Sequence, residues 1–434
     1  MKKILNTTIS LPIFLGIFMV QLEPIKYQEE KITNQVTNQE IISPKCQVKK
    51  WELPDILKSE KGKKIPVLIP RVPVSCCEND YSCLDEMIYG GNPEKMADKK
   101  ALLTAIDQSL KYLQTSNAEV AYKKYKIPEI TKERVDKSLR RFRELLLATN
   151  SPQELHTAIE KEFVFYQSLG KDSKGTVLFT AYYEPLYLAS RKQTKEFRYP
   201  AYRYPADLTS WTKPHPTRLE LEGADGLQAA KGKLKGLELF WFRDRLEPYI
   251  IQIQGSARLK LTDGTQTTIG YAGNTAYNYK SLGRSLVDDG KLPLEGLTMP
   301  IILDYFQKYP QDLNIYIPRD RSFVFFRETN GKPAQGSISV PLTPERSIAT
   351  DKSLMPPGAL ALIRAPFPFA NQNGELEHRT VSRYVLDQDT GGAIKGAGRV
   401  DYFLGTGKIA AERAGVTVSN GQLFYLLLKP KNNS

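Results

Sequence analysis

The stretch Thr176-Val-Leu-Phe-Thr-Ala-Tyr-Tyr183 marks the point at which the pattern of the chain changes. Its residues are mostly β-branched or aromatic, and it ends just before Pro185, as is typical of a β-strand. Before this stretch, apolar residues recur at steps of three and four; after it, short strand-like runs alternate with turns. The pattern predicts a mainly β protein with an N-terminal helical lead-in.

Three helices are expected in the lead-in, and packing explains all of them. The first begins near Asp98, the second begins at Thr131, and Ser151-Pro-Gln-Glu154 opens the third as a capping box with Pro at the first helical position. Their apolar faces consist of Leu102, Leu103, Ile106, Leu110 and Leu113, then Val135, Leu139, Phe142 and Leu146, then Leu155, Ile159 and Phe163.

The later part of the chain is rich in strand signals. Asp263-Gly264 between the alternating runs 258–262 and 265–271 predicts a β-hairpin. A short helix is expected over 298–309. Further strands are expected at 249–254, 322–327, 359–364, 381–386 and 423–428. Many short strands favour barrels over an alternating βα sheet.

The composition of the 434 residues is ordinary for a globular protein, with 41% hydrophobic and 25% charged residues. Lys and Arg exceed Asp and Glu by 61 to 48, a net charge of +13, which suits an anionic partner: nucleic acid, anionic lipid or an anionic wall polymer. His156, His215 and His378 lie far apart, which argues against a multi-His metal site and a His-driven triad. No metal or cofactor is expected.

The amino terminus resembles an export signal. Lys2 and Lys3 precede an uncharged stretch, residues 4–22, whose apolar centre is Leu11–Val20. The alternative is an uncleaved anchor helix, which would associate the protein with a membrane. Both interpretations place the rest of the chain outside the cytoplasm, in the periplasm or cell envelope, and disfavour a nucleic-acid partner. No Cys closely follows the apolar run as an acceptor for a lipid anchor.

Residues 23–95 are predicted to be a polar linker that carries all four cysteines. In an oxidising compartment an even number of cysteines favours disulfides. The adjacent Cys76 and Cys77 cannot easily pair with each other, so Cys46 and Cys83 are their expected partners, with the connectivity left open.

The densest cluster of chemically useful residues is Leu386-Asp-Gln-Asp-Thr-Gly-Gly-Ala-Ile-Lys-Gly-Ala-Gly-Arg-Val-Asp401. Glycines let a backbone approach a ligand closely. Asp401 is the only acid in an apolar run, and apolar surroundings raise the pKa of a carboxyl so that it can donate a proton near neutral pH. The competing interpretation is a polar turn with solvated aspartates.

Phe179-Thr-Ala-Tyr-Tyr-Glu-Pro185 combines hydroxyls and aromatic rings at a strand end, which suits carbohydrate. Tyr182 and Tyr183 point to opposite faces of a strand, so at most one of them belongs to a groove. A plain strand terminus is the alternative.

Together these segments resemble the membrane-bound lytic transglycosylase A family, which cleaves peptidoglycan. The resemblance spans roughly residues 100–430, and its last segment is similar to the three-aspartate domain. The matching segments are 179–185, 253–259, 270–273, 281–284, 322–328, 340–343 and 389–396.

The resemblance implies a double-psi β-barrel with a second β-barrel inserted into it and a glycan groove between the two. The implied parts are residues 1–22 as signal or anchor, 23–95 as extension, 96–188 as lead-in and first part of the double-psi barrel, 189–328 as insert, and 329–430 as the three-aspartate part.

The resemblance also implies a lyase that cuts the MurNAc–GlcNAc β-1,4 bond without water and leaves 1,6-anhydroMurNAc ends. Asp401 would be the single acid/base, Asp389 its close partner, and Asp351 a supporting acid. The implied glycan contacts are Thr180, Tyr182, Gln254, Tyr271, Ala272, Gly391, Gly392 and Lys395.

Three features depart from the family. Cys46 lies too far downstream to be the lipid-bearing Cys, 274–277 replaces a Lys-Asn-Gly-like run, and the segment 23–95 with all four cysteines has no counterpart in it. Two other functions compete with the lyase: a non-catalytic glycan-binding or wall-loosening barrel, and a conventional peptidoglycan hydrolase.

Overall fold

The structure is a computed structural model that describes residues 66–71, 83–90, 98–229 and 232–430. The predicted signal or anchor segment and most of the predicted linker lie outside the described residues. Cys83 is described and is disulfide-bonded. The other three cysteines lie outside the described residues. Among the described residues, no helix is both long and apolar enough to cross a membrane.

The helical lead-in contains the three predicted helices and one more. Thr131 and Ser151 cap the second and third predicted helices by accepting the N–H groups of Arg134 and Glu154. The predicted capping box at Ser151 forms only in part, since the Glu154 carboxylate accepts the N–H of Asn150 instead. The helices are α2 (Lys99–Leu113), α3 (Ser116–Lys123), α4 (Lys132–Ala148) and α5 (Pro152–Glu162).

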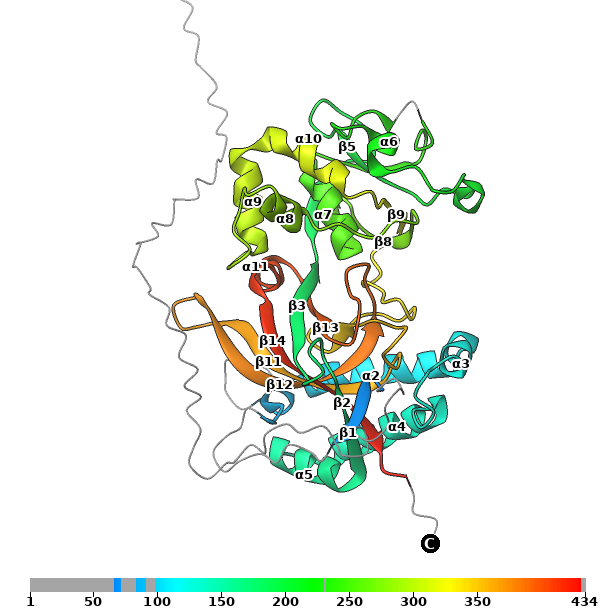
Figure 1. Cartoon of the computed structure of the whole chain (residues 1–434), viewed down its shortest axis with the longest axis vertical. Helices are drawn as coiled ribbons and strands as arrows, with labels where there is room; N and C mark the ends of the chain where they lie inside the picture. The colour runs from blue at the N-terminus through cyan, green and yellow to red at the C-terminus, as the bar shows by residue number, and fades with distance from the viewer. Residues whose placement is uncertain (1–65, 72–82, 91–97, 230–231, 431–434) are drawn as a thin grey trace, which may run out of the picture. The chain divides into compact units, whose positions relative to one another are not determined.

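A closed ring of six strands forms the main barrel (Figure 1). The ring runs through β3 (Val177–Glu184), β14 (Val418–Leu428), β11 (Leu360–Ala370), β12 (Leu376–Asp389), β10 (Ser347–Ala349) and β13 (Arg399–Thr406). Two strands extend it beyond β14, namely β2 (Phe163–Ser168) and β1 (Leu68–Arg71), and α11 (Lys408–Val416) packs on β3 and β13. The mainly β prediction is confirmed, while the double-psi connectivity stays a prediction.

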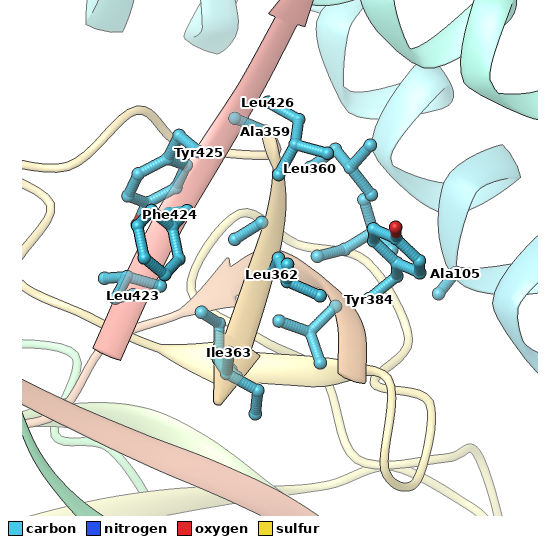
Figure 2. Close-up of a cluster of buried hydrophobic side chains, with 14 of the residues drawn as sticks. Ala105, Ala359, Leu360, Leu362, Ile363, Tyr384, Leu423, Phe424, Tyr425 and Leu426 are labelled. Atoms are coloured by element: carbon cyan, nitrogen blue, oxygen red, sulfur yellow. The ribbon is translucent and has the colours of Figure 1, made fainter. Parts of the chain in front are cut away.

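The core of this barrel joins strands to the helical lead-in. Figure 2 shows side chains of β11 and β14 in one cluster with Ala105 of α2. Each of the labelled residues is at least nine-tenths buried. The lead-in helices are therefore part of the barrel's hydrophobic core, because their apolar faces would otherwise be exposed to water.

The segment between β3 and residue 329 forms a second, smaller ring. Its four-stranded sheet has the order β4 (Leu186–Ala189), β7 (Ser256–Leu261), β8 (Gln266–Asn274), β9 (Val324–Glu328), and β5 (Tyr199–Tyr202) pairs with β6 (Glu238–Phe242). Single bridges from Arg203 to Phe326 and from Ser190 to Trp241 connect the two sheets. One apolar cluster draws on all six strands. This arrangement agrees with the predicted inserted barrel.

Helices accompany this second ring: α6 (Arg218–Glu222), α7 (Leu246–Gln254), α8 (Leu282–Asp288), α9 (Met299–Lys308) and α10 (Leu313–Tyr316). The helix predicted over 298–309 is confirmed as α9. The predicted hairpin is confirmed as β7 and β8, which pair antiparallel around Asp263-Gly264.

The strand predicted over 249–254 is wrong, because this segment is the helix α7. The start signal lies further upstream: the Asp244 carboxylate accepts the N–H of Leu246, and the Glu247 carboxylate accepts the N–H groups of Arg243 and Asp244. Gly255 ends the helix with a left-handed conformation. These local signals decide the structure of a short apolar run that periodicity alone leaves ambiguous.

Candidate active site

Four neighbouring strands align the predicted acids in one row. Asp401 of β13 lies opposite Thr180 of the parallel strand β3 and opposite Ala349 of β10. Ala349 in turn lies opposite Asp389 of β12. Directly opposed residues in a sheet project from the same face. The two aspartates therefore share a face, separated by one strand whose residue at that level is a small alanine.

Asp401 is half-buried and bonded to Thr180, whose hydroxyl donates to Oδ1 at 2.7 Å. Burial raises the pKa of Asp401 to about 6, and the Asp389 charge adds to this rise; the hydrogen bond from Thr180 and the charge of Arg399 act in the opposite direction. A carboxyl with this pKa is partly protonated near neutral pH and can both give and take a proton.

The apolar surroundings of the two acids differ from those that the sequence suggests. Val400 and Tyr402, the chain neighbours of Asp401, belong to the main barrel core, because alternate residues of a strand face opposite sides. The apolar cluster that contains Ala349 also contains Phe403, two residues after Asp401. Its remaining members are Tyr182, Ala334, Leu342 and Ile394. The sequence thus predicts a raised pKa for Asp401, but it attributes the rise partly to Val400 and Tyr402, which face the other side of the strand.

Asp389 is held on both carboxylate oxygens. The Tyr182 hydroxyl donates to Oδ2 at 2.8 Å, and the N–H groups of Ser337 and Thr390 each donate to Oδ1 at 2.8 Å. Burial raises the pKa of Asp389, although these hydrogen bonds oppose the rise. Tyr182 therefore connects β3 to the second acid, just as Thr180 connects β3 to the first.

The alternative of a solvated polar turn fails for Asp387, which is fully buried. The hydroxyls of Thr350 and Tyr425 donate to its carboxylate at 2.7 Å, and Lys352 forms an ion pair with it. Burial raises the pKa of Asp387 against these partners. Asp387 and its partners thus support the strand end that carries Asp389.

Asp351 holds the glycine-rich loop rather than touching the other two acids. Its carboxylate accepts the N–H of Gly396 at 2.8 Å and the hydroxyl of Ser353 at 2.7 Å. Burial opposes ionisation here, but these hydrogen bonds keep the pKa of Asp351 below its ordinary value. Among the described residues, no hydrogen bond links Asp351 to Asp389 or Asp401.

The glycine-rich loop, residues 390–398, joins β12 to β13. Its Ile394 is buried in the apolar cluster beside the acids, while Gly392 and Lys395 are exposed and Gly391 is half-buried. A Cβ at Gly392 would lie 3.6 Å from Cβ of Tyr279, a residue of the inserted segment. The loop therefore packs close to the inserted segment, while Gly392 and Lys395 remain exposed.

Three further predicted glycan contacts lie on the inserted segment. Gln254 ends α7, and its Oε1 accepts the N–H of Tyr183 at 3.0 Å, which ties the insert to β3. Tyr271 is 47% exposed and Ala272 is half-buried, both on β8. The structure thus brings together Thr180, Tyr182, Asp389 and Asp401, whereas no described hydrogen bond connects Tyr271 or Ala272 to them.

One residue beside the acids was missed by the sequence reasoning. Arg399 donates from Nη2 to Oγ1 of Thr180 at 3.1 Å. Its spacing of two from Asp401 was the available signal, because residues i and i+2 of a strand share a face. Among the described residues, no three His, Cys, Asp or Glu side chains converge as metal ligands would.

Family models match the two parts that carry these residues. The model described as the MltA specific insert domain matches residues 178–327, and the model described as the 3D domain matches residues 346–427. Membrane-bound lytic murein transglycosylase A from Escherichia coli K12 is 31% identical over 267 residues, which are 61% of this chain and 69% of that protein. This chain belongs to the membrane-bound lytic murein transglycosylase A family.

Other members agree with this assignment. The Vibrio cholerae protein of the same name is 31% identical over 264 residues, covering 60% of this chain and 68% of that protein. The crystal structure of E. coli MltA with bound chitohexaose matches with a TM-score of 0.59 at 26% identity, over 75% of this chain and 89% of that one. A membrane-bound lytic murein transglycosylase from Agrobacterium tumefaciens matches with a TM-score of 0.62 at 26% identity, over 79% and 95%.

Proposed function

We propose that this MltA-family chain is a peptidoglycan lytic transglycosylase that cuts the MurNAc–GlcNAc β-1,4 bond without water and leaves 1,6-anhydroMurNAc ends. Asp401 is the acid and then the base of this mechanism. The observation that carries the proposal is the half-buried Asp401 carboxyl, bonded to Thr180 and with its pKa raised to about 6. The family assignment supports the enzyme class.

The reaction begins when neutral Asp401 gives its proton to the oxygen that bridges the two sugars, and the C1–O bond breaks. The C6 hydroxyl of the same MurNAc residue then attacks C1, and its proton passes to the Asp401 carboxylate. The acid is restored, and no water is consumed. Because the nucleophile belongs to the substrate, correct positioning replaces a second catalytic acid.

The bonding of Asp389 favours this mechanism over hydrolysis. A hydrolase that inverts needs a second carboxylate to activate water, and a retaining hydrolase needs one as a nucleophile. Both oxygens of Asp389 already accept hydrogen bonds from the protein. We therefore assign Asp389 and Asp351 to the support of the site, and Asp401 alone to proton transfer.

The proposed substrate is the glycan strand of peptidoglycan, which would lie between the barrel and the inserted segment. The chitohexaose bound to E. coli MltA supports a β-1,4-linked amino-sugar ligand. In this proposal Thr180, Tyr182, Gly391, Gly392 and Lys395 line the barrel side. Gln254, Tyr271 and Ala272 line the insert side. The proposed location is the cell envelope, reached through the amino-terminal signal or anchor.

The test compares the wild type with Asp401→Asn and Asp389→Asn on purified sacculi, with products identified by mass spectrometry. We expect Asp401→Asn to slow the release of anhydro-sugar products by about a thousandfold. Asp389→Asn should slow this release less. Asp207→Asn is the matched control, because this exposed aspartate makes no side-chain cap. Reducing ends instead of anhydro ends would indicate a hydrolase, and binding without release would indicate a glycan-binding module.

A further inference from the structure

Arg399, Thr180 and Asp401 form a chain of two hydrogen bonds across β13 and β3. Nη2 of Arg399 donates to Oγ1 of Thr180 at 3.1 Å, and the same Oγ1 donates to Oδ1 of Asp401 at 2.7 Å. Arg399 and Asp401 are two residues apart on one strand, so they share a face. Thr180 stands opposite Asp401 in the register of the two strands.

The chemistry of the three groups fixes which of them donates and which accepts in each of the two hydrogen bonds. A guanidinium has only donors, whereas a hydroxyl has one hydrogen and two lone pairs. Because Arg399 supplies a hydrogen to Oγ1, the single hydrogen of Thr180 is directed to an acceptor, and Oδ1 of Asp401 lies within reach. Oδ1 is then an acceptor, and the proton of neutral Asp401 resides on Oδ2.

Within the described part of the chain, no hydrogen bond from another side chain or backbone group reaches Oδ2 of Asp401. Nor does Arg399 form an ion pair with Asp401 within that part, and its buried Nε has no hydrogen-bond partner there. Within the described residues, Arg399 is therefore linked to the acid by hydrogen bonds only through Thr180, while its charge acts on the carboxyl through space. Without Arg399, the Thr180 hydroxyl is free to accept a hydrogen from Oδ1 instead, which would hold the proton on the wrong oxygen.

We propose that Arg399 is a positioning residue that, through Thr180, keeps the transferable proton of Asp401 on Oδ2, the oxygen left free for the glycosidic bond. The proposal deepens the lytic transglycosylase mechanism proposed above and rests on it. It assigns no direct substrate contact to Arg399.

The charges around Asp401 make the proposal testable by pH. Arg399 on β13 favours the carboxylate, and Asp389 on β12 disfavours it. From β3, Tyr182 presents a hydroxyl whose pKa burial raises well above its ordinary value, so it stays neutral. From β10 the facing residue is Ala349, which carries no charge. Loss of Arg399 should therefore raise the pKa of Asp401.

The experiment uses the full chain with Arg399→Gln, Arg399→Lys, Thr180→Val and the Arg399→Gln/Thr180→Val double variant. Arg379→Gln is the matched control, because Arg379 is an exposed arginine of the same barrel that stacks on Phe369. One readout is the pH dependence of kcat/KM for anhydro-sugar release. The other is the ¹³C titration of the Asp401 carboxyl carbon, assigned by comparison with Asp401→Asn, which needs no activity.

We expect Arg399→Gln to lower the maximal rate by about tenfold, as for loss of one charge-assisted hydrogen bond. In this variant, the alkaline limb of the kcat/KM profile and the titration midpoint of the Asp401 carboxyl should both move to higher pH. Arg399→Lys should restore the position of the limb, because it keeps the charge. In the Thr180→Val background, Arg399→Gln should lower the rate much less than it does in the wild type, because both changes break the same pair of hydrogen bonds.

Two results would overturn the proposal: an unchanged titration of Asp401 in Arg399→Gln, or additive rate losses in the double variant. A wild type that titrates as expected but releases no anhydro sugar would refute the proposed function. The Arg399–Asp401 linkage would still be supported by the titration in that case.

Discussion

At the scale of single residues, Asp401 is held in an environment that favours its neutral form. Burial raises its pKa to about 6 from a reference value of 3.8. Folding thus favours the protonated acid, and this contribution to stability is complete below about pH 4 and lost as the pH rises to about 6. Above that range, the folded state carries the cost of a poorly solvated carboxylate.

Asp401→Asn should therefore stabilise the protein at neutral pH while removing activity. We expect a gain of about 1–2 kcal/mol in the free energy of unfolding near pH 7.5, reduced from the full shift because the side chain is only half-buried. Urea unfolding at about pH 7.5 and about pH 4 measures it. The gain should vanish at the lower pH; an equal gain at both would show that the charge is not its cause.

Asp389→Asn should move the alkaline limb of the rate profile in the opposite direction from Arg399→Gln. The Asp389 charge raises the pKa of Asp401, so its removal lowers that pKa. Protonated Asp401 is then lost at lower pH, and the alkaline limb shifts down. Steady-state rates on soluble glycan across the pH range measure the shift, and a limb that moves upward or stays in place contradicts this coupling.

At the scale of elements, β14 closes the main barrel by pairing with both β3 and β11, and Gly421 lies where these two pairings meet along the strand. Residues 418–421 of β14 pair with β3, and residues 422–425 pair with β11. A Cβ at Gly421 would lie 2.3 Å from the backbone oxygen of Arg364 and 2.5 Å from Cβ of Ala365. The absence of a side chain at Gly421 is what lets β14 and β11 approach each other closely. On β3, Thr180 lies opposite Val418 of β14, three residues before Gly421.

Gly421→Ala should accordingly destabilise the barrel by about 3 kcal/mol, the cost of forcing one extra carbon into a packed strand contact. Urea unfolding gives the free energy. Gly232→Ala is the control, because no atom lies within 4 Å of a Cβ at that position. Equal effects of the two changes would mean that lost backbone freedom, rather than the strand contact, determines the result.

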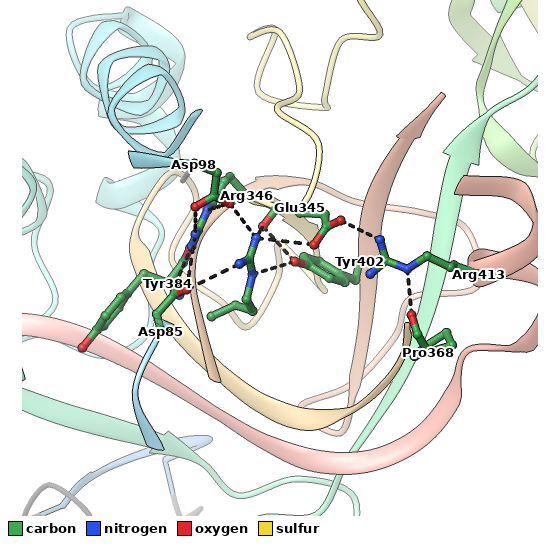
Figure 3. Close-up of polar contacts among 9 residues, drawn as sticks. Asp85, Asp98, Glu345, Arg346, Pro368, Tyr384, Tyr402 and Arg413 are labelled. Atoms are coloured by element: carbon green, nitrogen blue, oxygen red, sulfur yellow. Dashed lines mark hydrogen bonds and ion pairs between the residues drawn. The ribbon is translucent and has the colours of Figure 1, made fainter. Parts of the chain in front are cut away.

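At the scale of the whole molecule, a buried charge cluster ties distant segments together (Figure 3). Arg346 and Arg383 of the barrel are fully buried and each pairs with Asp85 and Asp98, residues that precede the helical lead-in. Asp85 also accepts the backbone N–H of Tyr384 at 2.8 Å. The hydroxyl of Tyr402, the residue after Asp401, accepts from Nε of Arg383 at 3.2 Å.

Asp85→Asn should destabilise the fold by about 3–5 kcal/mol, because it leaves buried guanidinium charge without its partner. Chemical denaturation measures the loss. Glu133→Gln serves as the control, since it removes a solvent-exposed ion pair with Lys137, and exposed ion pairs contribute little to stability. A small effect of Asp85→Asn would mean that Asp98 and Glu345 together balance the two arginines.

Part of this architecture was accessible from local patterns. The helices α2, α4 and α5 and the hairpin around Asp263-Gly264 follow from apolar periodicity and turn chemistry, which act over a few residues. The segment 249–254 shows the limit, because a short apolar run fits a strand or a helix equally well. The hydrogen bonds that the Asp244 and Glu247 carboxylates accept from backbone N–H groups at the start of α7 decide between them.

The chemistry available to this protein follows from its sequence alone: the acids Asp389 and Asp401, the glycines between them, and the hydroxyls of Thr180 and Tyr182. The arrangement of these groups depends on the folded chain. Strand register, set by contacts between residues more than 200 positions apart, places Thr180 on Asp401 and Tyr182 on Asp389. The pKa of Asp401 likewise depends on its burial, on Thr180 of β3 and on the charge of Asp389 on β12. Long-range packing sets both, because burial and charge act through space and not along the chain.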